Sequence, residues 1–361
     1  MMLKKLFFCI LIASLFSLTG CWDNKDINHR MMPVVLGISK EQEEYKLFLQ
    51  IPKAARGQIQ TIIVRETGTT INQIIDKMSA NLESSVDLLH AKVIIVDRSL
   101  AEEGMKDFIS GFMRSRDVPS KALMVISQND IEDIFTALEN QEHSEETVLL
   151  DFFEKNAGWN PQIPLTRVWQ VYQSIHSYTK DVSVAMINKG ENSICEFVGG
   201  AVIKNGKMVE MIDPNETLLY NAFNDESNQG KIEVLDEGSV MILGNRMNHD
   251  GKLVDGKPHF HSKLRLNVMV LETRGEASSE EIKQALTTLL LERYNRMFSK
   301  IQSSEADIFG IGQHFRKEIS REELKEWRSK YYPELVFTQE IIINIQNEGN
   351  LKMPAGKESQ A

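Results

Sequence analysis

The chain has 361 residues, of which 42% are hydrophobic and 25% are charged, and its formal net charge at pH 7 is −10. This length exceeds what one hydrophobic core usually serves, so about two or three domains are expected. The acidic balance argues against binding to nucleic acid or to anionic lipid head groups, because both repel a negatively charged surface.

Residues 1–20 have the pattern of a bacterial lipoprotein signal peptide. Two lysines precede an apolar run over residues 6–18, which is shorter than the ~20 residues that a permanent membrane-spanning helix needs. The box Leu18-Thr19-Gly20-Cys21 closes the run and predicts cleavage before Cys21. The Cys21 thiol would carry a diacylglyceryl thioether, and its amino group can take a second acyl chain. We therefore expect a lipoprotein held on the outer face of the membrane. The alternative is an ordinary secretory signal, or a chance cysteine beside a core helix.

Cysteine usage excludes an intramolecular disulfide in the mature chain. Cys9 would leave with the signal peptide and Cys21 would carry lipid, so Cys195 alone would remain as a thiol. Cys195 lies in a β-like apolar run. A buried cysteine acting as a small hydrophobic residue is expected there, rather than a reactive thiol.

Residues 21–190 are predicted to form an N-terminal region of two α/β subdomains. Apolar periodicity and capping residues predict, in chain order, strands at 34–38 and 45–51 joined as a hairpin, a helix from a Thr69 cap to Leu82, a strand at 93–96, a helix at 105–113, a strand at 123–126 and a helix from Asp130. Residues 147–169 read as an irregular packed connector. Strands and helices alternate in this half of the chain.

Residues 196–350 are predicted to form a C-terminal α/β domain, and residues 351–361 a flexible tail. The predicted elements are a hairpin of 197–203 and 208–212 turning at Asn205-Gly206, a helix capped by Asp213, a strand at 259–273, a helix from Ser278 or Ser279 to Gln302, a charged helix at 320–331 and a strand at 336–345. The expected fold class is α+β, a multi-domain ectodomain of small mixed β-sheets flanked by helices.

Signatures of enzymes are missing from the sequence. It contains no His-Glu-x-x-His zinc helix, no Gly-x-Ser-x-Gly elbow and no phosphate-binding loop with Gly-Lys-Ser/Thr. Gly310-Ile311-Gly312 lacks the third glycine of a dinucleotide fingerprint. We expect Asp307 to cap the turn at these glycines and Phe309 to fill the core, with a partner-facing loop as the alternative. No catalytic residue, cofactor or metal is predicted.

Two further patterns have a functional and a plain interpretation. His259 and His261 share one face of a predicted strand and His249 lies nearby, as a metal site would require, but no cysteine or carboxylate joins them at a fixed spacing. Solvated histidines are expected. The apolar stripe from Ile282 to Ile301 is expected to pack on a sheet rather than to dock another subunit.

The order of several segments resembles one known family. Cys21-Trp22-Asp23, Leu36-Gly37-Ile38, the stretch from Ala201 to Thr217, and Ala306-Asp307-Ile308-Phe309-Gly310-Ile311-Gly312 followed by Trp327 are together similar to the Ger(x)C family, the C-subunit lipoproteins of bacterial spore germinant receptors. The chain departs from the family pattern at residues 24–27 and at Glu210-Met211.

This resemblance implies three small α/β modules in a family-specific fold. It also implies attachment to the outer face of the spore inner membrane, assembly with the integral-membrane A and B subunits, and a non-enzymatic role in the response to nutrient germinants. A lipid-anchored solute-binding protein of a transporter is the first alternative, and a cell-envelope hydrolase is the second. A solute-binding protein usually shows two similar lobes, and no lobe repeat is visible in the sequence.

Overall fold

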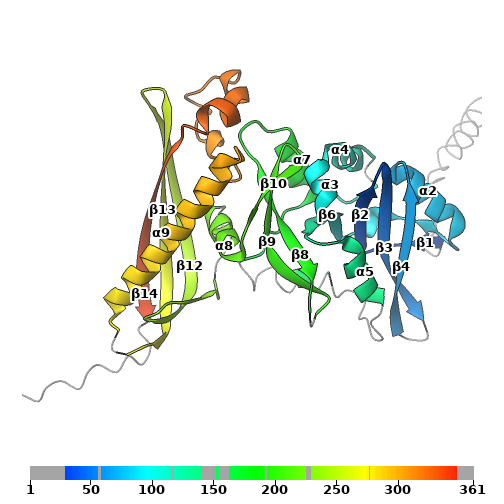
Figure 1. The fold of residues 1–361 in the computed structure, drawn as a ribbon, viewed down its shortest axis with the longest axis horizontal. Helices are drawn as coiled ribbons and strands as arrows, with labels where there is room; N and C mark the ends of the chain where they lie inside the picture. Colours follow the sequence, from blue (N-terminus) through cyan, green and yellow to red (C-terminus); the bar gives the residue numbers. More distant parts are fainter. Residues whose placement is uncertain are drawn as a thin grey trace, which may run out of the picture.

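The computed structural model describes residues 29–55, 58–115, 117–139, 149, 152–153, 162–191, 193–224, 229–275 and 277–347. This part of the chain forms an N-terminal unit around an eight-stranded sheet and a C-terminal unit around a four-stranded sheet. The units lie side by side along the longest axis of the molecule (Figure 1). The α+β class is therefore confirmed. The predicted signal peptide, Cys21 and the predicted tail lie outside the described residues.

The eight-stranded sheet has the order β10-β9-β8-β7-β6-β2-β3-β4, in which β9 (Cys195–Lys204) and β10 (Lys207–Ile212) come last in the chain. Its centre, from β2 through β6 and β7 to β8, is parallel, and antiparallel hairpins extend it at both ends. The strands from the first half of the chain are β2 (Val35–Glu41), β3 (Glu44–Ala55), β4 (Gln58–Gly68), β6 (Val93–Asp97), β7 (Leu123–Ser127) and β8 (Val182–Lys189). A separate short pair joins β1 (Arg30–Met31) to β5 (Ser85–Val86).

Helices cover both faces of this sheet, so its central strands are buried on both sides, as parallel strands usually are. One face packs against α2 (Ile71–Asn81), α3 (Arg98–Glu103), α4 (Lys106–Ser115) and α7 (Val168–Ile175), with a 3-10 turn at Leu88–His90. The other face packs against α5 (Ile131–Glu139).

The predicted elements of this half are largely confirmed. The hairpin of β2 and β3, strands β6 and β7, and helices α2, α4 and α5 lie where the apolar pattern predicted them. The N-cap of α2 is Thr70 rather than Thr69, since the Thr70 hydroxyl accepts the bond from the Gln73 N–H. The pattern did not indicate β4 or β8.

The hairpin of β9 (Cys195–Lys204) and β10 (Lys207–Ile212) belongs to the N-terminal sheet. Asn205 and Gly206 have φ angles of 51° and 78°, which confirms the predicted turn. Strand β9 pairs with β8, so the hydrogen bonds of the sheet cross the predicted boundary between residues 190 and 196. That boundary, and the two subdomains of 21–190, stay predictions.

Helix α8 (Pro214–Phe223) follows the hairpin and lies between the two units. Asp213 and Glu216 form the predicted capping box around its first turn. All eight residues from Glu216 to Phe223 are buried, because α8 contacts β9 on one side and α9 (Ser279–Ser303) and β12 (Gly238–Val254) on the other. A helix buried all round is typical of a core position.

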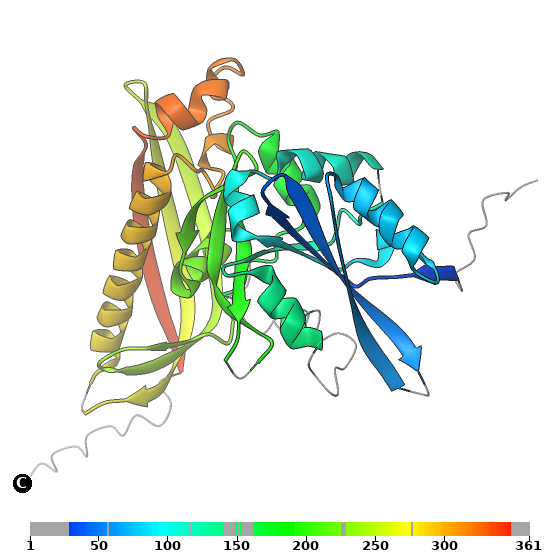
Figure 2. The ribbon, with the colours of Figure 1, turned by 45° about the vertical axis from the view of Figure 1, so that its right-hand side comes forward.

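The C-terminal sheet has the order β11-β12-β13-β14 and is packed against one long helix. Its elements are β11 (Ile232–Val234), β12 (Gly238–Val254), β13 (Lys257–Thr273), β14 (Val336–Asn347), which runs parallel to β13, and α9 (Ser279–Ser303). Figure 2 shows α9 lying along one face of these strands. The stripe from Ile282 to Ile301 is buried in this core, as predicted. The long strand β12 was not predicted.

The segment between α9 and β14 corrects one prediction. The charged α-helix expected over 320–331 is instead a 3-10 turn at Glu323–Glu326 followed by a π turn at Trp327–Tyr331, after another 3-10 turn at Ile311–Gln313. Tertiary contacts of Trp327 and Arg328, described below, account for the irregular geometry. Local charge and periodicity do not report such contacts.

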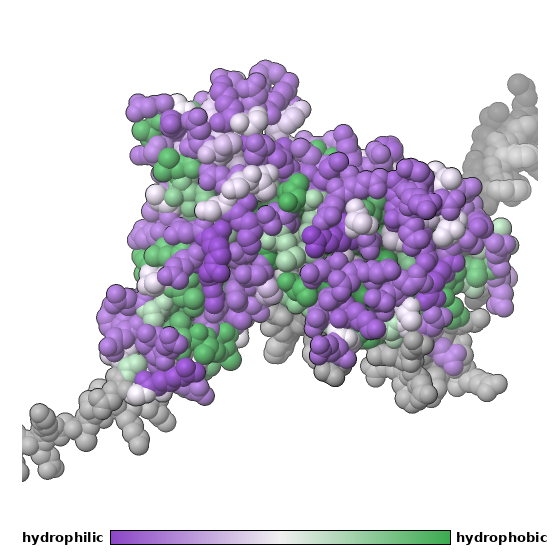
Figure 3. All heavy atoms as spheres, viewed as in Figure 1, coloured by the Kyte–Doolittle hydropathy of each residue, from purple (hydrophilic) through white to green (hydrophobic). Residues whose placement is uncertain are grey.

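Within the described ranges, no helix is long and apolar enough to cross a bilayer. The face drawn in Figure 3 is mostly hydrophilic, with apolar side chains gathered in small areas.

Gly37 in β2 tests the packing of the N-terminal unit. A Cβ atom at this position would lie 2.5 Å from the ring of Phe135, a fully buried side chain that stacks on Phe48. We expect Gly37→Ala to lower the free energy of unfolding by about 1–3 kcal/mol, because the enclosed ring must move. Gly111→Ala is the control, since its Cβ would meet no atom within 4 Å. Equal stability of the Gly37 variant and the wild type in denaturant titrations would contradict this packing.

Candidate functional site

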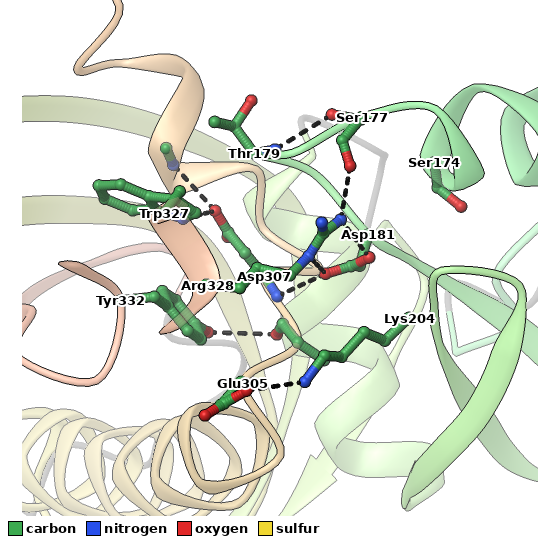
Figure 4. Close-up of polar contacts among 12 residues, drawn as sticks. Ser174, Ser177, Thr179, Asp181, Lys204, Glu305, Asp307, Trp327, Arg328 and Tyr332 are labelled. Atoms are coloured by element: carbon green, nitrogen blue, oxygen red, sulfur yellow. Dashed lines mark hydrogen bonds and ion pairs between the residues drawn. The ribbon is translucent and has the colours of Figure 1, made fainter. Parts of the chain in front are cut away.

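The candidate site is the polar contact between the two units, called here the junction (Figure 4). It consists of Asp181, Lys204, Glu305, Asp307, Trp327 and Arg328. Asp181 and Lys204 come from the N-terminal unit, and the other four follow α9 in the chain. The junction therefore joins segments that are distant in the sequence.

Asp181 lies directly before β8 and is fully buried. Arg328, in the π turn, donates from Nε to Oδ2 at 2.8 Å and from Nη2 to Oδ1 at 2.7 Å. Nη2 also donates to the carbonyl oxygen of Ser177 at 2.8 Å. This two-pronged contact is the strongest geometry that arginine and a carboxylate can form.

Two more hydrogen bonds join Asp181 directly to the backbone of Asp307. The Asp181 N–H donates to the Asp307 carbonyl oxygen at 2.8 Å, and the Asp307 N–H donates to Oδ2 of Asp181 at 3.0 Å. These two bonds fix the loop after α9 to the start of β8, so neither unit can slide without breaking them.

The Asp307 carboxylate organises the turn that follows it. Oδ1 accepts from the Ile311 N–H at 2.9 Å, while Oδ2 accepts from the Gly312 N–H at 2.8 Å and from the Trp327 indole N–H at 2.9 Å. The predicted capping role of Asp307 is confirmed. A Cβ atom at Gly312 would lie 2.6 Å from the Trp327 ring, so only glycine allows this approach.

Two lysines form ion pairs at the edge of the junction. Lys204 in β9 donates to the Ser304 carbonyl oxygen and to the Glu305 carboxylate, each at 3.0 Å. Lys300 in α9 forms a 2.7 Å ion pair with the buried carboxylate of Glu216 in α8. Lys204 thus joins the N-terminal sheet to the residues directly after α9, and Lys300 joins α9 to α8.

Burial dominates the electrostatics of the two aspartates. It raises the pKa of Asp307 to about 7, and the neighbouring Asp181 carboxylate adds to this rise, while three donated hydrogen bonds oppose it. Burial also raises the pKa of Asp181 despite the adjacent Arg328 guanidinium. Tyr332 is buried beside both groups, and its pKa is raised by burial and by their charges.

The junction holds the two units together. Each carboxylate oxygen of Asp181 and Asp307 already accepts at least one hydrogen bond from the protein, and both side chains are fully buried. Because both carboxylates are enclosed, neither presents an oxygen to a substrate or a cation in solution. The arrangement acts as a mechanical connection between the units.

The structure places the other candidate residues as follows. Cys21 lies outside the described residues. Cys195 is buried, and burial raises the pKa of its thiol to about 12, which fits the predicted role of a small hydrophobic residue. His249 faces the core side of β12 beside Ser262, whereas His261 is exposed on the other face. The structure therefore does not bring His249 and His261 together.

Sequence reasoning missed Asp181 and Arg328. They are 147 residues apart, and neither stands in a motif. The one local signal was Asp307 with its glycines, which indicated a capped turn but not the unit against which that turn packs.

Comparisons with known proteins match nearly the whole chain. Residues 23–189 match the model "Spore germination protein N-terminal domain", and residues 198–349 match the model "Spore germination B3/ GerAC like, C-terminal". Spore germination protein GerQC of Bacillus cereus is 21% identical over 89% of this chain and 92% of that protein. Spore germination protein B3 of Bacillus subtilis (strain 168) is 22% identical over 78% of this chain and 79% of that protein.

One solved structure has the same fold. The crystal structure of the GerBC protein superposes with a TM-score of 0.56 over 86% of this chain and 97% of that chain, at 14% sequence identity.

Arg328→Met tests the ion pair of the junction. Removing the guanidinium leaves the buried Asp181 charge without a counter-ion, so we expect the free energy of unfolding to fall by about 3–5 kcal/mol. Lys330→Met is the matched control, because Lys330 lies on the same turn and is exposed. Denaturant titration checks both variants. A loss for Arg328→Met no larger than for the control would show that the pair does not hold the units together.

Asp307 gives a pH dependence with a defined sign. Its pKa is near 3.8 in the unfolded chain and about 7 in the folded one. The folded state therefore binds the proton more tightly, and this contribution to stability is lost as the pH rises through about 7. We expect the stability of the wild type relative to Asp307→Asn to decrease from pH 5 to pH 8 in thermal unfolding. A constant difference across that range would contradict the assignment.

Proposed function

The chain belongs to the Ger(x)C family of spore germination proteins, and on that premise we propose that it is the lipid-anchored subunit of a nutrient germinant receptor. The observation that supports this proposal best is that the two family models together match residues 23–189 and 198–349, nearly the full length. The proposed location is the outer face of the spore inner membrane, and the proposed partners are the integral-membrane A and B subunits of the receptor.

Attachment at Cys21 is the first part of the proposal. It is supported by the lysines, the short apolar run and the Leu18-Thr19-Gly20-Cys21 box. The first described strand begins at Arg30, so at most a short segment separates it from Cys21. The N-terminal unit would then lie close to the bilayer.

A non-enzymatic scaffold role is the second part. The junction supports it. Hydrogen bonds to the buried Asp181 and Asp307 carboxylates, together with the ion pair to Arg328, join the two units into one body. A rigid body fixed to the membrane can hold the extracytoplasmic parts of the A and B subunits in position, so that a rearrangement caused by the germinant is passed on. The alternative of a solute-binding protein is not favoured, since the family models describe germination proteins along both halves.

Cys21→Ala tests the anchor. Without the thiol no thioether can form, so the variant should incorporate no labelled fatty acid and should lose stable membrane attachment and the germination response, while its described units stay folded. Membrane fractionation, acyl labelling and nutrient-triggered germination measure these effects. Cys9→Ala and Cys195→Ala are matched controls, because Cys9 would leave with the signal peptide and Cys195 is buried. Unchanged fractionation and germination in the Cys21 variant would refute the proposal.

A further inference from the structure

The C-terminal sheet has one face that the described chain leaves open. Helices α8 and α9 pack on the other face, where the β13 side chains Leu264, Leu266 and Val268 are buried. Residues that alternate with these point away from the core, and the resulting surface is called here the open face. It includes Arg246, Asn248, Asp250 and Lys252 of β12, His261, Lys263, Arg265 and Met269 of β13, and Glu340 and Ile342 of β14.

Two arginines lie directly opposite each other at the centre of the open face. Arg246 of β12 and Arg265 of β13 are register partners in the antiparallel pair, so their side chains project from the same face. Like charges in this position destabilise a sheet. Among the described residues, no carboxylate forms an ion pair with either arginine, and Arg265 reaches only the neutral Asn248 amide, at 2.6 Å. The fold thus keeps an unfavourable pair that an external anion would relieve.

The charges around the pair extend the positive region. Lys252 and Lys263 share the open face, and the carboxylates on it are Asp250 and Glu340, of which Glu340 is already paired with Lys263 at 2.7 Å. A positive surface in a chain of net charge −10 is a local feature that complements an acidic partner.

One end of the open face is apolar. Ile232 and Val234 of β11 and Leu271 of β13 are 47%, 63% and 40% exposed, and Met241 and Met269 lie half-buried beside them. Met269 is four positions along β13 from Arg265, which is about 13 Å in a strand. A partner segment could therefore place apolar side chains on this end and a carboxylate on the arginines.

We propose that the open face docks an acidic, partly apolar segment of a partner protein, with a carboxylate bound between Arg246 and Arg265. This inference rests on the proposed assembly with the A and B subunits and names the surface that serves it. Arginine forks bind carboxylates bidentately, which suits such a contact. Lipid head groups fit less well, because the open face has only four arginines and lysines, the low end of the roughly four to eight in a lipid-binding cluster, and Asp250 and Glu340 offset part of their charge.

The test uses the full, lipidated chain with an affinity tag, produced together with the A and B subunits. The variants are Arg246→Glu, Arg265→Glu and the double replacement, and Arg114→Glu is the matched control on an exposed position of α4. Subunits recovered with the tagged chain are quantified from detergent-solubilised membranes. We expect the double variant to recover at least about tenfold less than the wild type and the control to recover the same amount.

Misfolding is separated from lost docking by the single variants. Arg246→Glu places a carboxylate opposite Arg265, which replaces a repulsive pair by an attractive one. Its melting temperature should equal or exceed that of the wild type while its recovery of partners falls.

The remaining outcomes separate a failure of this inference from a failure of the proposed function. If the wild type recovers neither subunit, the proposed function fails together with this inference. If the wild type and the double variant recover the subunits equally, the inference fails and the assembly stands. If the variants lose only the preference for phosphatidylglycerol over phosphatidylcholine vesicles, the open face binds head groups and the inference is overturned.

Discussion

The ion pair between Asp181 and Arg328 constrains the rest of the molecule. The Asp181 carboxylate is fully buried, and the Arg328 guanidinium neutralises it at close range, whereas an unpaired buried charge costs several kcal/mol. Arg328 must therefore lie within hydrogen-bonding distance of the start of β8, although it belongs to the far end of the chain. Asp307 binds Asp181 through its backbone and Trp327 through its carboxylate, and the close contact of Gly312 with Trp327 packs the same segment beside the ion pair.

This constraint makes the two units a single body. The core around α8 and α9 includes Val202 of β9 and Ile212 of β10, so apolar packing crosses the junction as well as polar contacts do. Along the long axis in Figure 1, the N-terminal strands lie at one end of this body, and the open face belongs to the unit at the other end.

Sequence reasoning predicted what local chemistry determines. Asn205-Gly206 specified its hairpin, Asp213 and Glu216 specified the start of α8, and the turn at Asp307 followed from its glycines. It failed where contacts between residues far apart in the sequence determine the structure. Strand β8 could not be assigned to the same sheet as β2, and Trp327 gave no sign that it would draw the segment around it out of the α-helical form. The pairing of Asp181 with Arg328 has no local pattern at all.

The pairing of β9 with β8 also bears on how the chain folds as it is made. Strand β8 is an open edge until residues 195–204 have emerged, and an open edge can pair with other chains. Asp181 emerges 147 residues before Arg328, so it must stay hydrated while the first unit assembles and can be buried only when the last segment arrives. A product that stops before residue 195 would keep the open β8 edge, and one that stops before Arg328 would have the whole sheet but leave Asp181 without its counter-ion.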